Sequence, residues 1–199
     1  MVWHMIIVST DGSCLRNPGG AIGWAWVNHE GPSRAGGERS GTNQIAELRA
    51  LLEALKAHPG PEPMIIESDS QYAIKCASEW LPGWKRKGWK TATGAPVKNL
   101  DLVQAIDRVL AERSGPVRFR WVRGHVGNHF NELADKLAGE AARAQGAAPP
   151  APKAPVSEPA GPEPTPAPAR PEPTPAPARA KKAVRRTVKV VEEVELTLF

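Results

Sequence analysis

The chain has 199 residues, of which 41% are hydrophobic, a share that supports one globular core. Its formal net charge is +5, and its two cysteines are too few for a disulfide framework and suit a reducing compartment. No apolar run approaches the roughly 20 residues that span a bilayer, and the N-terminus lacks a signal-peptide pattern. We therefore expect a cytoplasmic protein without membrane contact.

The first half of the chain predicts three strands and a helix. Residues 5–11 read as a strand that ends in an acid, residues 21–27 alternate in polarity, and residues 33–40 form a third, weaker strand. Thr42 or Asn43 can cap a helix that runs to about residue 57 and carries a stripe of leucines. The turn residues at 58–61 end this helix.

The second half alternates between strands and helices. Residues 64–69 read as a short buried strand ending at Asp69, and a helix follows over about 70–80. Asn99 can cap another helix, and residues 117–121 alternate as a last strand. A final helix carries an apolar stripe of Phe130, Leu133, Ala134, Leu137 and Ala138. This order predicts an α/β domain with a mixed sheet covered by helices.

The last quarter of the chain has a different composition. Of 21 prolines, 13 fall between Pro149 and Pro177, and a nonapeptide at 162–170 recurs unchanged at 171–179. Such a tract favours solvated polyproline II. We predict a globular domain over 1–145, a disordered Pro/Ala-rich linker over 146–180, and an interaction segment over 181–199. That last segment is basic and then apolar-acidic, which suits a nucleic-acid grip, a strand added to a partner protein, or no partner.

Four acids occupy positions that we expect to converge: Asp11, Glu47, Asp69 and Asp135. Asp11 and Asp69 end predicted strands, Glu47 lies in the first turn of its helix, and Asp135 shares a polar helix face with Asn128 and Asn131. Two carboxylates about 4 Å apart repel by roughly 4 kcal/mol at an effective dielectric near 20. Hard divalent cations remove that cost, and oxygen ligands favour Mg²⁺ or Mn²⁺. Singly, each acid can instead be a turn, cap or surface residue.

Residues 85–90 place four cations within six residues, beside Trp80 and Trp84. Basic side chains interleaved with aromatic rings favour nucleic acid, because cations meet phosphates while flat rings pack on sugars or bases. A solvated loop with structural tryptophans is the alternative.

Five stretches of the chain resemble bacterial ribonuclease HI, in the same order and over about residues 4–143. They are residues 11–19 (DGSCLRNPG), 42–48 (TNQIAEL), 68–72 (SDSQY), 83–102 (GWK through NLDL) and 124–135 (GHVG through NELAD). The resemblance implies the RNase H fold, a five-stranded mixed sheet flanked by helices. It also implies that the RNA strand of RNA–DNA hybrids is hydrolysed with divalent metal, two Mg²⁺ (or Mn²⁺) ions per site.

The same resemblance assigns roles to individual residues. It makes Asp11, Glu47, Asp69 and Asp135 the metal ligands, and gives His125, on a glycine-flanked loop, a part in proton transfer or product departure. The implied substrate contacts are Asn17, Thr42, Asn43, Gln44, Gln71, Trp80, Trp84, Lys85, Arg86, Lys87, Trp89 and Lys90. Amide side chains among them suit 2′-hydroxyls and base edges, and the basic ones match a protrusion that grips the DNA strand. Gln44 departs from the family, where asparagine is common, and so does Gly83.

Two other functions compete with this one. A proofreading 3′–5′ exonuclease carries Asp-x-Glu on its first strand, whereas Ser13 stands at the third position here. A non-catalytic hybrid-binding module tethered by its tail would be expected to lose an acid, yet all four are present with His125. The expectation is therefore a monomeric ribonuclease H whose partner is an RNA–DNA hybrid, with a protein or nucleic-acid partner for the tail left open.

Overall fold

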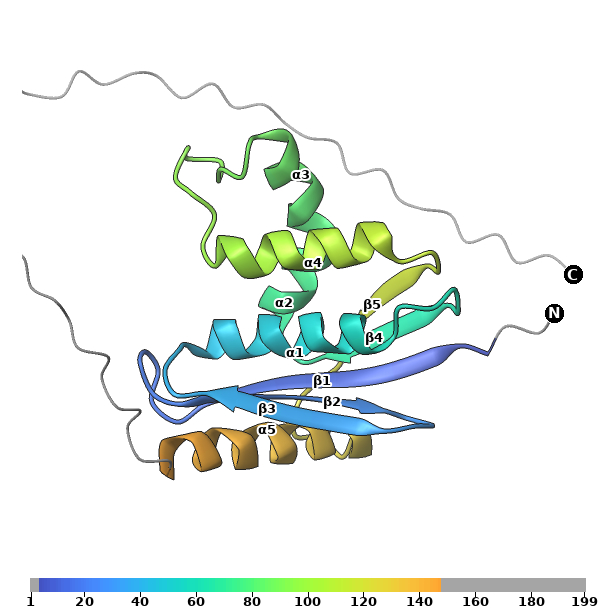
Figure 1. The fold of residues 1–199 in the computed structure, drawn as a ribbon, viewed down its shortest axis with the longest axis vertical. Coiled ribbons are helices and arrows are strands. Elements are labelled where there is room, and N and C mark those ends of the chain that lie inside the picture. The colour runs from blue at the N-terminus through green and yellow to red at the C-terminus, as the bar shows by residue number, and fades with distance from the viewer. Residues whose placement is uncertain (1–3, 148–199) are drawn as a thin grey trace, which may run out of the picture. The chain divides into compact units, whose positions relative to one another are not determined.

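A computed structural model describes residues 4–147 of the chain; the predicted interaction segment and all but the first two residues of the predicted linker lie outside them. Residues 4–147 form a five-stranded sheet in the order β3-β2-β1-β4-β5 (Figure 1). β1 pairs antiparallel with β2 and parallel with β4, so the predicted mixed sheet is confirmed. The strands are β1 (Ile6–Cys14), β2 (Ile22–Asn28), β3 (Ser33–Glu38), β4 (Met64–Ser68) and β5 (Val117–Trp121).

Helices cover both faces of the sheet, with α1 on one face and α5 on the other (Figure 1). The predicted helix over 70–80 is split: α2 passes into a π-helical segment, η1, and then into α3. The helices are α1 (Asn43–Ala57), α2 (Gln71–Lys75), η1 (Cys76–Trp80), α3 (Leu81–Arg86), α4 (Leu100–Glu112) and α5 (His129–Ala147). Among the described residues no helix combines the length and hydrophobicity needed to cross a bilayer.

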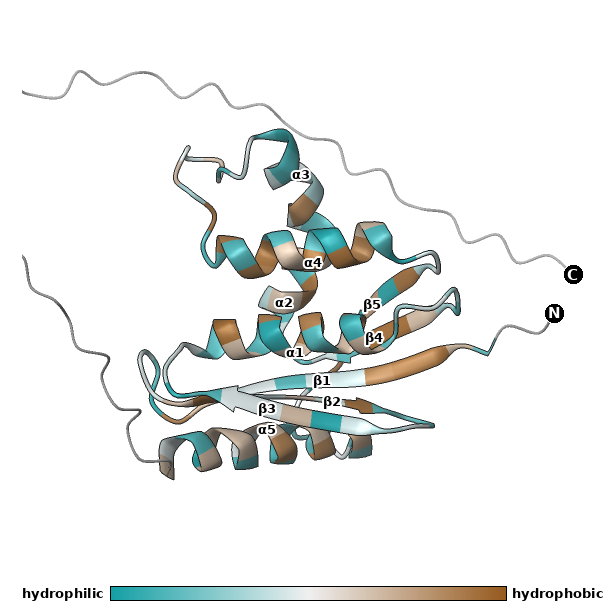
Figure 2. Cartoon of the chain, viewed as in Figure 1, coloured by the Kyte–Doolittle hydropathy of each residue, from teal (hydrophilic) through white to brown (hydrophobic). Residues whose placement is uncertain are grey.

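The main core lies between the sheet and α1, α2 and α4. The predicted leucine stripe of α1 is fully enclosed, since Leu48, Leu51, Leu52 and Leu55 are at most 1% exposed. β1 is hydrophobic in its first half and polar in its second (Figure 2). Val8 lies in this core, whereas Asp11 follows in the polar half. One strand thus serves both as core and as carrier of a charged group.

The opposite face is packed by small residues. A Cβ added to Gly23 of β2 would lie 2.0 Å from the carbonyl oxygen of Ala138, so the α5 backbone rests directly on the strand. The innermost residues of α5 are accordingly Ala134, Ala138 and Ala142, all 0% exposed. The predicted Leu133 and Leu137 are only half-buried, because an approach this close leaves no room for leucine at the contact.

The two predicted helix caps have different outcomes. Thr42 caps α1, its hydroxyl accepting a hydrogen bond from the backbone N–H of Ile45 at 3.3 Å. Asn99 precedes α4 but does not cap it. Its backbone is left-handed (φ 55°), and its side-chain amide donates to the Tyr72 hydroxyl at 3.3 Å instead. Tyr72, in α2, has drawn the side chain away from the helix end.

Candidate active site

Three of the four acids come together at one edge of the sheet. Asp11, Glu47 and Asp69 each offer a carboxylate oxygen, and these oxygens lie within 4.8 Å of one another. Asp69 directly follows β4, as predicted. Asp11 does not end its strand, because β1 continues to Cys14, and Glu47 lies one residue beyond the first turn of α1. We call Asp11, Glu47 and Asp69 the acidic cluster.

Two glycines make this convergence sterically possible. A Cβ on Gly12 would lie 2.3 Å from the backbone nitrogen of Glu47, so only glycine lets α1 approach β1 this closely. A Cβ on Gly124 would lie 2.3 Å from a carboxylate oxygen of Asp69. The first glycine fixes the separation of two carboxylates, and the second leaves space for the third.

Glu47 is nearly enclosed within the acidic cluster. It is 8% exposed, and one of its oxygens accepts a hydrogen bond from the Asn43 side-chain amide at 3.3 Å. Its other oxygen, Oε2, is buried and has no hydrogen-bond partner among the described residues. A buried carboxylate oxygen without a donor costs free energy, and a cation would relieve that cost.

Burial and mutual repulsion perturb two of the three acids. Burial, followed by the charge of Asp69, raises the pKa of Asp11 to about 8, although the Gly12 N–H partly offsets this. Burial, followed by the charges of Asp11 and Asp69, raises the pKa of Glu47 well above its usual range. The cluster therefore lacks positive charge of its own and favours protons or cations.

These donors fit a hard divalent cation. All are carboxylate oxygens, which Mg²⁺ and Mn²⁺ prefer, and the unpartnered Glu47 oxygen offers a free ligand position. The alternative that Asp69 caps the next helix is wrong, because Ser70 does so, accepting from the Ala73 N–H at 3.2 Å. Its carboxylate is thus not committed to that helix end.

Asp135 lies apart from the acidic cluster's three converging oxygens. Its side chain is 48% exposed on α5, and its Oδ2 is 4.0 Å from Nδ1 of His125. His125 is 77% exposed on the loop before α5 and has a left-handed backbone (φ 55°). The negative charge of Asp135 nevertheless contributes to the raised pKa values of Asp11 and Glu47, so Asp135 is electrostatically coupled to the acidic cluster.

Of the three residues predicted to share a polar face of the last helix, only Asp135 is a partly exposed residue within α5. Asn128 precedes α5 and its side-chain oxygen accepts from the Asn131 N–H at 3.2 Å, so it acts as a cap. Asn131 is 1% exposed, and its side-chain oxygen is buried without a partner among the described residues. Because α5 packs closely on the sheet, it encloses Asn131, which the periodicity groups with the polar residues of the helix.

Most of the polar, uncharged residues among the predicted substrate contacts lie around the N-terminus of α1. The Asn17 side-chain oxygen accepts from the Asn43 backbone N–H at 3.3 Å, which joins the loop after β1 to this helix. Thr42 is engaged as the cap, and the Gln44 side-chain oxygen is buried without a partner in the described part of the chain. Gln71, the first residue of α2, is exposed.

The basic segment and its tryptophans divide into exposed and packed residues. All four cations are exposed, and one of them, Lys85, also pairs with Asp107 of α4 at 2.9 Å; the other three are Arg86, Lys87 and Lys90. Two of the predicted substrate tryptophans, Trp84 and Trp89, are half-buried against the hydrophobic core, and Trp80 is 37% exposed. The predicted grip therefore retains three exposed cations that form no ion pair within residues 4–147, while two of its rings pack against the core.

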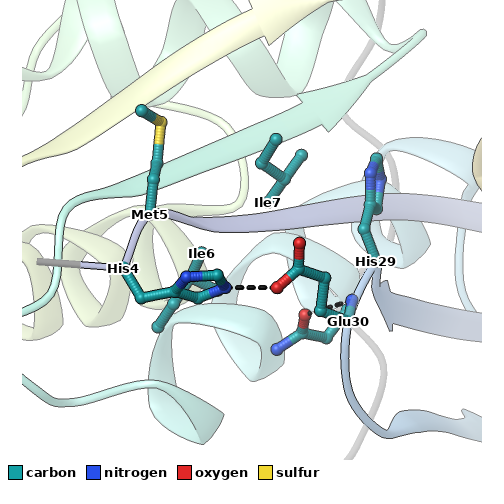
Figure 3. A pocket seen from close by; sticks show the side chains of 7 residues that line it. His4, Met5, Ile6, Ile7, His29 and Glu30 are labelled. Atoms are coloured by element: carbon teal, nitrogen blue, oxygen red, sulfur yellow. Dashed lines mark hydrogen bonds and ion pairs between the residues drawn. The ribbon is translucent and has the colours of Figure 1, made fainter.

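A separate pocket of about 140 Å³ opens at the other end of β1 (Figure 3). Its lining includes His4 and Glu30, whose side chains are hydrogen-bonded across it. Both side chains are largely exposed. Since the acidic cluster lies toward the opposite end of the strand, this pocket is not part of the site.

Comparison with known proteins identifies the family. The RNase H family model matches residues 4–143. The chain belongs to the RNase H family. Ribonuclease H of Anaeromyxobacter sp. (strain K) is 46% identical over 147 residues, covering 69% of this chain and 79% of that protein. Ribonuclease H of Herminiimonas arsenicoxydans is 48% identical over 136 residues, covering 67% and 91%.

Solved RNase H structures share the fold. LC9-RNase H1, described as a type 1 RNase H with the type 2 active-site motif, superposes with a TM-score of 0.63 and 30% identity, over 73% of this chain and 75% of that one. The PFV RNase H domain gives a TM-score of 0.59 and 25% identity, over 70% and 94%. The fold expected from the sequence resemblance is thus confirmed.

One residue that contacts Asp69 is absent from the predicted site residues. The indole N–H of Trp121 donates to the backbone carbonyl of Asp69 at 3.0 Å, and its ring is 48% exposed. Alternation along β5 predicts Trp121 only as a strand residue. Its place next to Asp69 follows from the parallel pairing of β4 and β5, in which Ser68 lies opposite Trp121.

Proposed function

We propose that this protein is a monomeric, cytoplasmic ribonuclease H that hydrolyses the RNA strand of RNA–DNA hybrids with Mg²⁺ or Mn²⁺. The observation that carries this proposal is the acidic cluster, three carboxylate oxygens within 4.8 Å on the fold of a nuclease family. A non-catalytic hybrid-binding module would have no need of such an electrostatically costly group.

The residues of the chain divide the chemistry among them. Asp11, Glu47 and Asp69 would hold two divalent ions, with Asp135 as a more exposed ligand. Two such ions supply an activated water and neutralise charge on the leaving oxygen. His125, exposed in its glycine-flanked loop, is placed to carry a proton between the site and solvent. Gly12 and Gly124 hold the carboxylates at their separations.

Substrate selection would come from the rim of the site. Side-chain amides of Asn17, Asn43 and Gln71 can both donate to and accept from a 2′-hydroxyl, which DNA lacks. Positive charge at Arg86, Lys87 and Lys90 would hold the backbone of the DNA strand. The RNA strand would then lie over the acidic cluster.

A panel of duplexes tests the proposal. Labelled RNA–DNA, RNA–RNA and DNA–DNA duplexes are incubated with the full-length chain, with Mg²⁺ or with EDTA. We expect internal cuts in the RNA strand of the hybrid, and only with Mg²⁺. Hybrid binding without any cleavage would instead support the tethered module, and stepwise loss from a 3′ end would support an exonuclease.

The three cations of the basic segment that lie outside the Lys85–Asp107 ion pair should set the salt dependence of hybrid binding. Changing Arg86, Lys87 and Lys90 together to Ala should flatten the slope of log K against log salt by about 0.7–0.9 for each phosphate that is no longer neutralised. Turnover at saturating hybrid should change little, because these side chains stand away from the acidic cluster. Lys56→Ala, in the last turn of α1, is the control. An unchanged slope in the triple variant would mean that the segment is only solvated.

Residues after the α/β domain should not be needed for cleavage. The acidic cluster and every core residue named above precede Ala147, where α5 ends. A chain ending at residue 147 should therefore fold and cleave hybrid in Mg²⁺ at a rate close to that of the full chain. Weaker binding at low salt would indicate that residues 181–189 grip nucleic acid, and loss of a co-purifying protein would indicate a partner for residues 188–199. Failure to fold would contradict the predicted domain boundary.

A further inference from the structure

An exposed tryptophan borders the acidic cluster. Trp121 is the last residue of β5, and almost half of its large apolar side chain faces solvent. The other end of the ring is fixed, because its N–H donates to the Asp69 carbonyl at 3.0 Å. The fold therefore holds an aromatic surface in a defined orientation, one hydrogen bond away from a proposed metal ligand. The hydrophobic core does not account for an exposed ring at this place.

The ring forms one wall of a hollow of about 270 Å³. The other lining residues are Gln71, Ile74, Lys75 and Glu79. Successive residues of this set are at most four positions apart along α2 and η1, so the hollow follows this helical stretch away from the acidic cluster. The hollow is a groove beside the helix, open to solvent on one side, with apolar, cationic and amide groups in its wall.

Lys75 gives the hollow an uncommitted positive charge. Within residues 4–147 its ammonium group forms no ion pair, in contrast to Lys85, which pairs with Asp107. Glu79 lies one helical turn farther from Asp69 and makes that end of the hollow less favourable for an anion. A phosphate would accordingly bind nearer to Lys75 and Gln71.

We propose that this hollow is a contact site for the RNA strand next to the nucleotide at the acidic cluster. The proposal rests on the proposed function. The Trp121 ring offers its face to a ribose or base, Lys75 meets the adjoining phosphate, and Gln71 reaches a 2′-hydroxyl. The occupant is the RNA strand rather than the DNA strand. The Trp121 indole is hydrogen-bonded to the backbone of Asp69, and the strand that is cut must lie against Asp69.

Two substitutions of Trp121 separate its ring face from its N–H. Both Trp121→Ala and Trp121→Phe lose the hydrogen bond to Asp69, so any effect on kcat through that bond is common to them. Only Trp121→Ala loses the aromatic face. We expect Trp121→Ala to raise KM for the hybrid about five- to twentyfold and Trp121→Phe to leave KM within about threefold of wild type. Met5→Ala, which trims a side chain that is 50% exposed at the other end of β1, is the matched control.

The two charged residues of the hollow, Lys75 and Glu79, provide an independent test of the proposed contact site. Lys75→Ala should weaken hybrid binding and flatten the salt slope by about 0.7–0.9, the change expected when one phosphate is no longer neutralised. Glu79→Gln should tighten binding at low salt. Equal KM values for Trp121→Ala and Met5→Ala, or equal increases for Trp121→Ala and Trp121→Phe, would overturn the proposal.

Failure of the proposed contact site can be distinguished from failure of the proposed nuclease function. If wild type cleaves hybrid and Trp121→Ala matches Met5→Ala, the contact site is wrong while the nuclease assignment stands. If wild type binds hybrid without cutting it, the nuclease assignment is wrong, and the dissociation constants of the same variants still decide the contact site. Melting temperatures of Trp121→Ala and Trp121→Phe within a few degrees of wild type show that neither KM reports unfolding.

Discussion

Asp69→Asn should abolish nearly all hybrid cleavage while leaving the fold intact. The amide matches the carboxylate in shape, so the Trp121 bond to the backbone carbonyl and the space beside Gly124 are both retained. What disappears is one of three charges that would hold the divalent ions. Stabilisation by such ions is worth several kcal/mol in the transition state, and about 3 kcal/mol corresponds to a hundredfold in rate. We therefore expect kcat in saturating Mg²⁺ to fall by about a hundredfold or more.

Controls assign that loss to the site. Asp101→Asn removes an exposed acid from the first turn of α4 and should leave kcat unchanged. Asp135→Asn should have a smaller effect than Asp69→Asn, because Asp135 lies outside the group of converging oxygens and is half exposed. Hybrid binding by Asp69→Asn, measured in the same buffer, should survive. More than a few percent of wild-type kcat in Asp69→Asn would exclude Asp69 as a principal ligand.

The sequence predicts the fold where a residue's role depends on its near neighbours. The leucine stripe of α1 and its Thr42 cap are local patterns, and both have the predicted structure. Asn99 shows the limit: its sequence position suits a cap, but the Tyr72 hydroxyl, 27 residues away, takes its amide. Asn131 is similar, because only the close seating of α5 on Gly23 reveals that it is enclosed.

The candidate site likewise has features that the sequence predicts and features that only tertiary packing determines. Carboxylates at strand ends and on a helix can be expected to converge, and three of them do. The role of Gly12 and Gly124 as spacers between backbones and carboxylates emerges only from the packed elements. Lys85 and Asp107 are 22 residues apart in sequence and lie on different helices, so the basic segment alone does not predict their ion pair. Trp121 reaches Asp69 through strand pairing across 52 residues.

Asp11→Asn should stabilise the metal-free protein at alkaline pH. Burial and the charge of Asp69 raise the pKa of Asp11 to about 8 in the folded chain, whereas an unfolded aspartate titrates near 4. Between these values the folded state binds the extra proton, so its stability falls as pH rises. Below about pH 4 Asp11 is protonated in both states, and the wild-type fold has its full stability. That stability falls progressively as the pH rises to about 8. An amide stays neutral throughout, so the variant escapes this loss.

Urea unfolding in EDTA at pH 5 and pH 9 measures the effect. Since one pKa unit corresponds to about 1.4 kcal/mol, Asp11→Asn should exceed wild type by about 2–5 kcal/mol at pH 9 and by much less at pH 5. Added Mg²⁺ should narrow the gap at pH 9, because the ion neutralises the wild-type acidic cluster but gains less from the variant. Asp101→Asn, exposed on α4, should follow wild type at both pH values. A gap that is equal at pH 5 and pH 9 would mean that Asp11 is ionised in the folded protein at both, and that the acidic cluster carries less repulsion than its geometry implies.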